Sequence, residues 1–497
     1  MSTLAMPLDR ESESPLAPTL AAAAAAAAVQ LAIVLSLLGR YGWDRDELYF
    51  RSAAHHPALG YVDFPPLTAW LAWLVDRLDP GSLDALRLTS ALLGSATVLL
   101  VALTVRELGG GLRAQLGGAL AWAVTPYVLG SASIFHPTWL DALAWAAFLY
   151  VATRLLRRGE QRLWPVLGAI AGLGLEAKYT IAFLLAVFAV ALVVGGRRGL
   201  LATRGPWLCA AVALALLAPN LAWQAAHGWP SLHFFSSQQA QTAADTSPGA
   251  YLAEQVAFLG GTFVVAMLGV RRLWRDRALR PLGLVPVLVT LVFLLERGRG
   301  YYPLPADAVA VAAGAVALER RTRLRRALPA ALAALQVAAL VFAAPIVVPF
   351  HSTGAMVRSG VWKSGFYDDE IGWPQLSAQV ERAWQALPPA TRAHAAVLAQ
   401  NYGEASALAR YRPDLPVLSG HLSWQYWRPR SLPQTVVLTV GYERGDATAL
   451  CRSWRLDARI AIPYGLANQE QGRPIATCEL RRPLGELWGR LVARDRL

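Results

Sequence analysis

The chain has 497 residues, of which 55% are hydrophobic and 16% are charged, and its mean hydropathy is +0.37. Soluble proteins carry about 25% charged residues, so this composition excludes an ordinary soluble enzyme. The net charge of +13 does not indicate nucleic-acid binding, because the arginines cluster in short loops between apolar blocks. These blocks recur up to about Phe350, and a spanning helix needs about 20 apolar residues, so the pattern predicts a polytopic α-helical membrane protein.

The N-terminal region, residues 1–18, is polar and carries no positively charged segment ahead of the first apolar block. We therefore expect a cytoplasmic tail followed by a retained helix rather than a cleaved signal peptide. Residues 19–349 form the predicted transmembrane domain. Its eleven predicted spans are 19–39, 83–105, 114–130, 137–153, 163–177, 180–196, 206–223, 251–270, 281–295, 303–318 and 327–349.

Arginine placement predicts the orientation of these spans. Every second loop is basic, whereas the intervening loops 131–136 and 224–250 carry no Lys or Arg. The basic loops are then cytoplasmic, which places loop 40–82, loop 224–250, the 296–302 turn and everything after 350 outside. The loop arginines are Arg106, Arg113, Arg154, Arg157, Arg158, Arg162, Arg197, Arg198, Arg204, Arg271, Arg272, Arg275, Arg277, Arg280, Arg320, Arg321, Arg323, Arg325 and Arg326.

The first outer loop contains two predicted helices. In "FPPLTAWLAWLVDRL", Leu67, Trp70, Leu71 and Leu74 recur at helical spacing, which indicates an amphipathic helix in the membrane interface, started by the Pro-Pro step. The stretch "DELYFRSAAHH" predicts a second short interfacial helix, ended by Pro57.

The tail, residues 350–497, predicts a small α/β domain outside the membrane. "AAVLAQNYGEASAL" is typical of a strand, a turn and a helix, and "TVVLTVGY" is typical of a strand. Cys451 and Cys478 share this tail and form a disulfide only if it faces an oxidising compartment and folding brings them together, which the sequence leaves open. Cys209 lies in an apolar block and is expected to be a packing residue.

Acidic residues follow the first span closely. Asp44, Asp46 and Glu47 come within a few residues of it, and Asp63 precedes the Pro-Pro step. A solvated loop face would explain one such residue. Several acids next to interfacial helices favour a site at the outer membrane boundary, where a carboxylate acts as a general base or binds a divalent metal.

Further ionisable residues lie near the ends of spans, where they are costly and therefore functional candidates. Asp141 follows "FHPTWL", Glu176 and Lys178 stand in "LGLEAKYT", and Asp307 lies near the start of the tenth span. For Glu176 and Lys178 the alternative is mutual pairing, although residues two apart on a helix do not face each other. For Asp307 the alternative is solvent exposure.

Cations are scarce on the predicted outer face. Lys178, Arg297 and Arg299 are candidates to hold a phosphate, and Tyr301 and Tyr302 in "RGRGYYPLP" would add hydroxyl groups. An aromatic belt at the interface is an equal explanation for the two tyrosines. Together with the acids, these residues suit a substrate whose phosphate lies at the membrane surface and whose lipid tail lies within it.

Several segments resemble bacterial glycosyltransferase family 39, which is related to the dolichyl-phosphate-mannose protein mannosyltransferases and the 4-amino-4-deoxy-L-arabinose lipid A transferase. The first-loop segment "DELYF…GYVDFPPLTAWLAWL" is the most specific. "GLGLEAKYT", "APNLAWQAAHGWPSLHF", "RGRGYYPLPADAVAVAAGAVAL", "NYGEASALARY" and "LSGHLSWQYW" extend the similarity over most of the chain. The chain departs from the family at Phe64, where relatives often carry His, and at Arg297 and Arg299, where they often carry Lys.

The resemblance implies a GT-C fold in a bacterial inner-membrane enzyme that transfers a sugar from a polyprenyl-phosphate donor on the extracytoplasmic face. It implies Asp46, Glu47 and Asp141 as catalytic residues, with Asp46 as the base or a metal ligand and Lys178 as a phosphate contact. Tyr61 and Asp63, within the first-loop segment, join Arg297, Arg299, Tyr301 and Tyr302 as predicted substrate contacts. A divalent metal, held by Asp46 and Asp141 if present, stays open as a cofactor.

Two other functions compete with the enzyme. A transporter or flippase for lipid-linked sugars needs polar residues along a path through the midplane, whereas the predicted spans are mostly Ala, Leu and Val. A scaffold or receptor would concentrate its function in residues 350–497. The sequence favours the glycosyltransferase, with an envelope protein, lipid or glycan as acceptor, and it names neither the sugar nor the acceptor.

Overall fold

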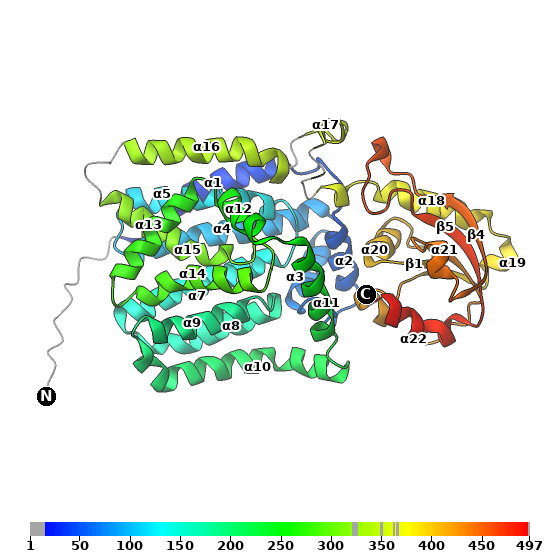
Figure 1. Ribbon diagram of the computed structural model, residues 1–497, viewed down its shortest axis with the longest axis horizontal. Helices are drawn as coiled ribbons and strands as arrows, with labels where there is room; N and C mark the ends of the chain where they lie inside the picture. The colour runs from blue at the N-terminus through cyan, green and yellow to red at the C-terminus, as the bar shows by residue number, and fades with distance from the viewer. Residues whose placement is uncertain (1–14, 321–326, 348–350, 361–362, 364–366, 496–497) are drawn as a thin grey trace.

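A computed structural model describes residues 15–320, 327–347, 351–360, 363 and 367–495. Long helices lie side by side in a bundle, and a smaller part containing a sheet adjoins one end of it (Figure 1). The predicted tail 1–18 falls mostly outside the described residues. The bundle helices are α1 (Leu16–Leu35), α4 (Leu83–Glu107), α5 (Leu112–Ala123), α6 (Pro126–Ala132), α7 (Thr138–Arg158), α8 (Trp164–Ala177), α9 (Ile181–Val194), α10 (Arg204–Ala226), α12 (Pro248–Leu259), α13 (Thr262–Arg275), α14 (Arg280–Leu295), α15 (Asp307–Glu319) and α16 (Ala327–Val347).

Each of the eleven predicted spans coincides with one helix or with two successive helices. Within the described residues, four helices are long and apolar enough to cross a membrane, namely α1, α4, α7 and α10, and the pair α12–α13 adds a fifth if it forms one span. Shorter apolar helices, among them α9 and α14, complete the bundle. The chain is thus a multi-pass membrane protein, and the number of eleven crossings stays a prediction.

The predicted span 251–270 is not one straight helix. Helices α12 and α13 meet at an angle of 99° across Gly260 and Gly261. Gly260 has φ +57°, and a Cβ there would lie 2.7 Å from Ala339 Cβ of α16. A Cβ on Gly261 would lie 2.8 Å from the backbone of the same helix. The break therefore follows from two glycines that let α16 approach closely.

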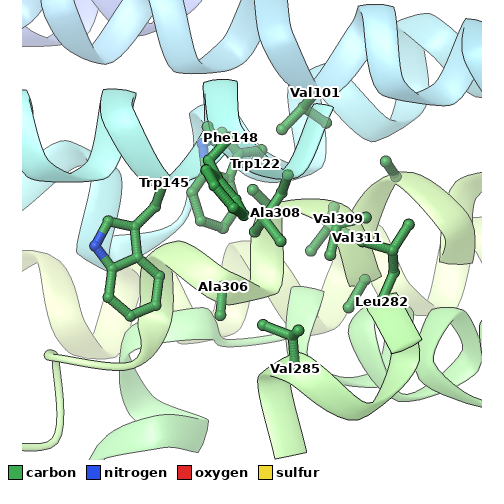
Figure 2. Packing of buried hydrophobic residues seen from close by; sticks show 14 of the residues in the cluster. Val101, Trp122, Trp145, Phe148, Leu282, Val285, Ala306, Ala308, Val309 and Val311 are labelled. Carbon is green, nitrogen blue, oxygen red and sulfur yellow. The ribbon is translucent and has the colours of Figure 1, made fainter. Parts of the chain in front are cut away.

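The bundle core lies where α4, α5, α7 and α15 meet. Figure 2 shows Trp122 and Phe148 beside Ala308, with Trp145 farther to the left, and all of them are buried. Small residues bring α13 and α15 together, since a Cβ on Gly269 would stand 1.7 Å from the carbonyl oxygen of Ala310. Close approach at small residues is how membrane helices gain packing without a hydrophobic driving force.

Arginine-rich loops lie at the end of the bundle away from the sheet, here called the basic end. Arg158 at the end of α7 pairs with Glu107 at the end of α4 at 2.6 Å. Arg157 and Arg320 both lie within 4 Å of a Cβ built on Gly109. The opposite end is called the sheet end, and it carries the sheet and the helices α2 (Arg45–Ala54), α3 (Leu67–Leu78) and α11 (Pro230–Asp245) (Figure 1). This segregation agrees with the predicted alternation of loops.

Both helices predicted in loop 40–82 exist. Helix α3 (Leu67–Leu78) buries Ala69, Ala72 and Val75 and leaves Trp70 and Trp73 exposed, as an interfacial helix requires. Helix α2 (Arg45–Ala54) begins with a capping box between Asp44 and Glu47. The prediction that α2 lies in the membrane interface was wrong, because nearly all of its side chains are buried and it packs against α3 and against α20 (Tyr402–Tyr411) of the tail.

The tail contains a five-stranded sheet in the order β2-β1-β3-β5-β4, with β1 parallel to β2 and β3 and with β5 antiparallel to β3 and β4. The strand and the helix predicted in "AAVLAQNYGEASAL" are β1 and α20, and the strand predicted in "TVVLTVGY" is β3. Cys451 on β4 and Cys478 on β5 form a disulfide with a Cα–Cα distance of 5.5 Å. The elements of the sheet end are α11 (Pro230–Asp245), α17 (Thr353–Ser359), α18 (Trp373–Ala386), α19 (Pro389–Arg392), β1 (Ala395–Ala399), α20 (Tyr402–Tyr411), β2 (Val417–Leu418), η7 (Leu422–Tyr426), β3 (Val436–Val440), α21 (Arg444–Ala447), β4 (Cys451–Arg459), β5 (Pro474–Leu480) and α22 (Leu484–Asp495).

Candidate active site

A cavity of about 890 Å³ lies at the sheet end, between the bundle and the tail. We call it the acidic cavity, because Asp44, Asp46, Asp63, Asp368 and Asp369 line it. Residues from distant parts of the sequence complete its wall: the break between α8 and α9, the turn before α15, and the tail. Of the predicted site residues, it brings together Asp46, Asp63, Lys178, Arg299, Tyr301 and Tyr302.

Asp46 lies in the first turn of α2, and its carboxylate is held from two sides. The Tyr402 hydroxyl of α20 donates a hydrogen bond to Oδ1 at 2.7 Å, and His136 Nε2 lies 3.5 Å from Oδ2. Burial opposes ionisation of Asp46, but His136 and the Tyr402 hydroxyl together hold its pKa below the usual range. The carboxylate therefore stays ionised at neutral pH while its side chain remains about one-third exposed.

Arg45 lines the cavity and forms ion pairs with two residues of the tail. Its Nη2 pairs with Glu470 at 2.9 Å and with Asp369 at 3.1 Å. Burial raises the pKa of Asp369 to about 6, against the lowering effect of Arg45. Because Arg45 precedes Asp46 directly, these pairs fix the start of α2 and with it the position of the Asp46 carboxylate.

Glu47, predicted to be catalytic, does not line the acidic cavity. It is fully buried, and its carboxylate accepts hydrogen bonds from Arg87 and from the backbone N–H groups of Asp44 and Phe135 at 2.8–3.0 Å. Arg87 Nη2 also pairs with Glu370 at 2.9 Å. Both Glu47 oxygens are thus engaged inside the protein, and its catalytic role stays a prediction.

Asp141, also predicted to be catalytic, is buried one turn below the cavity in α7. Its two oxygens accept hydrogen bonds from Trp145 Nε1 at 2.8 Å and from Thr180 Oγ1 at 2.7 Å. Asp141 thus anchors the break between α8 and α9, two residues after Lys178. Asp46 and Asp141 lie at the same end of the bundle, as predicted, but do not share the cavity wall.

Cations occupy another part of the cavity wall. Lys178 Nζ lies 5.0 Å above the Tyr302 ring and 5.6 Å from the Tyr301 ring. Both Arg299 and Arg297 are exposed, but Arg299 lines the cavity and Arg297 does not. The two predicted arginines are therefore separated, and the cationic face consists of Lys178 and Arg299. The tyrosines hold Lys178 by cation–π contact, a contact that neither of the two predicted roles included.

Asp63 and Tyr61, both predicted to contact the substrate, line different cavities. Asp63 lines the cavity and accepts a hydrogen bond from the Tyr49 hydroxyl at 2.8 Å. Burial raises its pKa to about 7. Tyr61 is buried, and its hydroxyl donates to the His56 carbonyl at 3.1 Å. Tyr61 lines a different hollow, described below.

Other candidates lie away from the cavity. Glu176 is buried in α8, and Asp307 is 6% exposed at the start of α15, so solvent exposure does not explain it. Residues not singled out from the sequence do line the cavity, namely His136, Tyr402, His421 and Gln469. A signal existed for three of them, since they stand in "FHPTWL", "NYGEASALARY" and "LSGHLSWQYW". Only the fold shows that these segments meet Asp46.

The predicted metal ligands, Asp46 and Asp141, do not share the wall of the acidic cavity, and a metal cofactor stays a prediction. Both Asp141 oxygens accept hydrogen bonds inside the protein, from Trp145 and Thr180. Among the described residues, no group of three or more His, Cys, Asp or Glu side chains converges in a way that could hold an ion. We therefore derive no step through a metal.

The bundle, the cavity and the adjoining sheet define a membrane protein with the GT-C glycosyltransferase fold. The family described as dolichyl-phosphate-mannose-protein mannosyltransferase matches residues 63–223, less than half of the chain. No curated protein matches this sequence.

Two solved structures of ArnT from Cupriavidus metallidurans have the same fold. The form bound to undecaprenyl phosphate is 16% identical, with a TM-score of 0.63 over 92% of this chain and 98% of that one. The apo form is 15% identical, with a TM-score of 0.64 over 93% of this chain and 98% of that one. The similarity spans both the bundle and the tail, which confirms the predicted fold class.

Proposed function

We propose that this protein transfers a sugar from a polyprenyl-phosphate donor to an envelope acceptor on the extracytoplasmic face of a bacterial inner membrane. One observation carries the proposal: an ionised carboxylate, Asp46, shares a cavity with the cations Lys178 and Arg299. A base and a phosphate-binding face are the two parts that such a transfer needs.

The chemistry follows from this arrangement. A hydroxyl or other nucleophile of the acceptor gives its proton to Asp46 while its heteroatom forms a bond to the anomeric carbon of the sugar. The bond from that carbon to the phosphate oxygen breaks, and the phosphate leaves with the electron pair. Lys178 and Arg299 stabilise the added negative charge, in a setting where opposite charges interact more strongly than in water.

Two findings support the donor and the orientation. One of the ArnT structures is bound to undecaprenyl phosphate, and a lipid phosphate of this kind matches a cationic face at the end of a helical bundle. The disulfide between Cys451 and Cys478 supports an oxidising compartment for the sheet end, as bacterial disulfides form outside the cytoplasm. The acceptor is a protein, lipid or glycan of the envelope.

The test uses purified protein in liposomes with a radiolabelled polyprenyl-phosphate sugar and an envelope extract. We expect wild-type protein to label the extract and Asp46→Asn to lose at least ~10²-fold in rate, as removal of a general base does. Asp84→Asn, an exposed acid at the start of α4, is the matched control and should keep its rate. Transfer by Asp46→Asn at the wild-type rate would refute the proposal, as would donor translocation without transfer by wild-type protein.

A further inference from the structure

A second hollow of about 300 Å³ lies at the sheet end, outside the acidic cavity. The connection between α2 and α3, the end of α10 and the residues around η7 enclose it. Aromatic rings form most of its wall. His56 stacks on Trp427 with ring centroids 4.6 Å apart, and His227 stacks on Trp223 at 4.0 Å. Tyr426 stands edge-on to His227 at 5.1 Å. We call this the aromatic hollow.

The aromatic hollow is separate from the acidic cavity. Tyr61 lines the hollow and Phe64 lines the cavity, and the two rings stack at 4.6 Å. Trp427 of the hollow lies 5.8 Å from Tyr49 of the cavity. A ligand in the hollow therefore lies beside the site of the proposed transfer without entering it.

Backbone contacts define the hydrogen-bonding chemistry of the two histidines. His56 Nδ1 lies 2.9 Å from the Ser52 carbonyl oxygen, and His227 Nδ1 lies 2.8 Å from the Trp223 carbonyl oxygen. A carbonyl oxygen only accepts, so each Nδ1 carries a proton, and a ring with a single proton presents Nε2 as an acceptor. Ser423 is buried in the wall, where its oxygen accepts from the Val62 N–H at 3.0 Å and its hydroxyl is hydrogen-bonded to the Tyr49 hydroxyl.

Gly60 allows the wall to form. A Cβ at this position would lie 2.5 Å from the Trp223 ring, so only glycine lets that ring lie flat against the loop. The indole of Trp223 is thereby held beside the backbone that leads into Tyr61.

The wall excludes several ligand classes. No Lys, Arg, Asp or Glu side chain borders the hollow in the described part of the chain, so neither a phosphate nor a cation finds a partner there. The ring pairs already stack on each other, so they do not form two free parallel faces that would clamp a flat ligand. What remains is a small, neutral, partly apolar site with hydrogen-bond acceptors and a hydroxyl.

We propose that the aromatic hollow binds one neutral sugar residue of a glycan. The C–H face of a sugar ring is apolar and packs on aromatic rings, while its hydroxyl groups can donate to the imidazole nitrogens of His56 and His227. A volume of about 300 Å³ lies at the lower end of the ~300–1,000 Å³ of small-molecule sites, which suits a single residue rather than a whole lipid-linked donor.

The test measures binding of three soluble probes, chitotriose, mannotriose and maltotriose, to the full chain in a detergent without a sugar headgroup. Saturation-transfer NMR and tryptophan fluorescence report contact with the wall. We expect at least one probe to bind with a Kd on the order of 1 mM. The double variant His227→Ala/Tyr426→Ala should weaken that binding at least tenfold, and both residues are exposed, so the fold should survive.

Two variants serve as controls. Tyr464→Ala removes a ring that is 67% exposed elsewhere in the tail and should bind the probe like wild type. Asp46→Asn, which tests the proposed transfer, should also bind it, so failure of the transfer and failure of the hollow are distinguishable. Three results would overturn the proposal: no binding of any probe by wild type, wild-type affinity in the double variant, or loss of binding in Asp46→Asn alone.

Discussion

Asp46 and Glu47 are neighbours in the sequence with opposite surroundings. Asp46 faces a cavity and accepts one strong hydrogen bond from Tyr402, whereas Glu47 is fully buried with every oxygen engaged. A side chain with both oxygens occupied positions its neighbours, and a side chain with accessible lone pairs can take a proton. The two arginines differ in location, since Arg299 lines the cavity and Arg297 does not, although both side chains are exposed.

At the residue scale, Asp63 makes the stability of the folded protein depend on pH. Burial raises its folded-state pKa to about 7 from the ordinary 3.8, so between these values the folded protein binds more protons than the unfolded chain. The sign of the linkage means that Asp63 costs stability as the pH rises through this window. We expect Asp63→Asn, which keeps the acceptor for Tyr49, to raise Tm by about 2–4 °C at pH 8 and little at pH 4, measured by thermal unfolding in detergent. An equal shift at both pH values would contradict this account.

A substitution at Tyr402 tests how the tail affects the pKa of Asp46. Its hydroxyl helps to hold the pKa of Asp46 low, so Tyr402→Phe should raise that pKa. Because the base acts when ionised, the acid limb of the pH–rate profile should move to higher pH while the rate at high pH changes less. Tyr411→Phe on the same helix is the matched control. A uniform loss of rate at all pH values would instead indicate a purely structural role.

At the scale of elements, α2 is fixed by buried ion pairs at its first turn. Glu47 joins it to Arg87 of α4, and Arg87 joins both to Glu370 of the tail. Removing one member of a buried pair leaves an uncompensated charge, at a cost of about 3–5 kcal/mol. These pairs explain why α2 lies inside the protein rather than in the membrane interface.

We therefore expect Glu47→Gln to destabilise the protein more than Asp46→Asn does. Thermal unfolding of the purified proteins in detergent should show a clear fall in Tm for Glu47→Gln and a small change for Asp46→Asn. A Glu47→Gln variant with wild-type Tm and no activity would return Glu47 to the catalytic residues.

The break between α12 and α13 is the second feature at this scale. Gly260→Ala introduces a strained φ and a contact at 2.7 Å with α16, so we expect it to destabilise the protein by more than ~1 kcal/mol. Gly249→Ala in the first turn of α12 meets no atom within 4 Å and should have little effect. Comparison of the two melting temperatures measures the difference. Equal melting temperatures would show that the bend does not depend on Gly260.

At the scale of the whole molecule, residues of the tail form part of the wall of the candidate active site. Tyr402, His421 and Gln469 line the acidic cavity, and Ser423, Tyr426 and Trp427 line the aromatic hollow. The tail thus borders both the site of the proposed transfer and the proposed sugar site. A scaffold whose function lay in the tail alone would not need these contacts with α2.

Much of this architecture is predictable from the sequence, because apolar length and arginine placement depend on local composition. The bundle segments, α3, β1, α20 and β3 follow from such patterns. The burial of α2 and of Asp141 is not predictable in this way, since it depends on partners such as Arg87 and Thr180 that lie 40 and 39 residues away. The bend at Gly260 depends likewise on α16, which a local pattern does not include.

The most direct test of the central claim is mass spectrometry of the lipids and envelope glycans of a deletion strain. Complementation with wild-type protein or with Asp46→Asn completes the comparison. The account predicts that the deletion removes one sugar from an envelope component, that the matching polyprenyl-phosphate sugar accumulates, and that only the wild-type gene reverses both changes. Reversal by Asp46→Asn, or an envelope that loses no sugar, would contradict it.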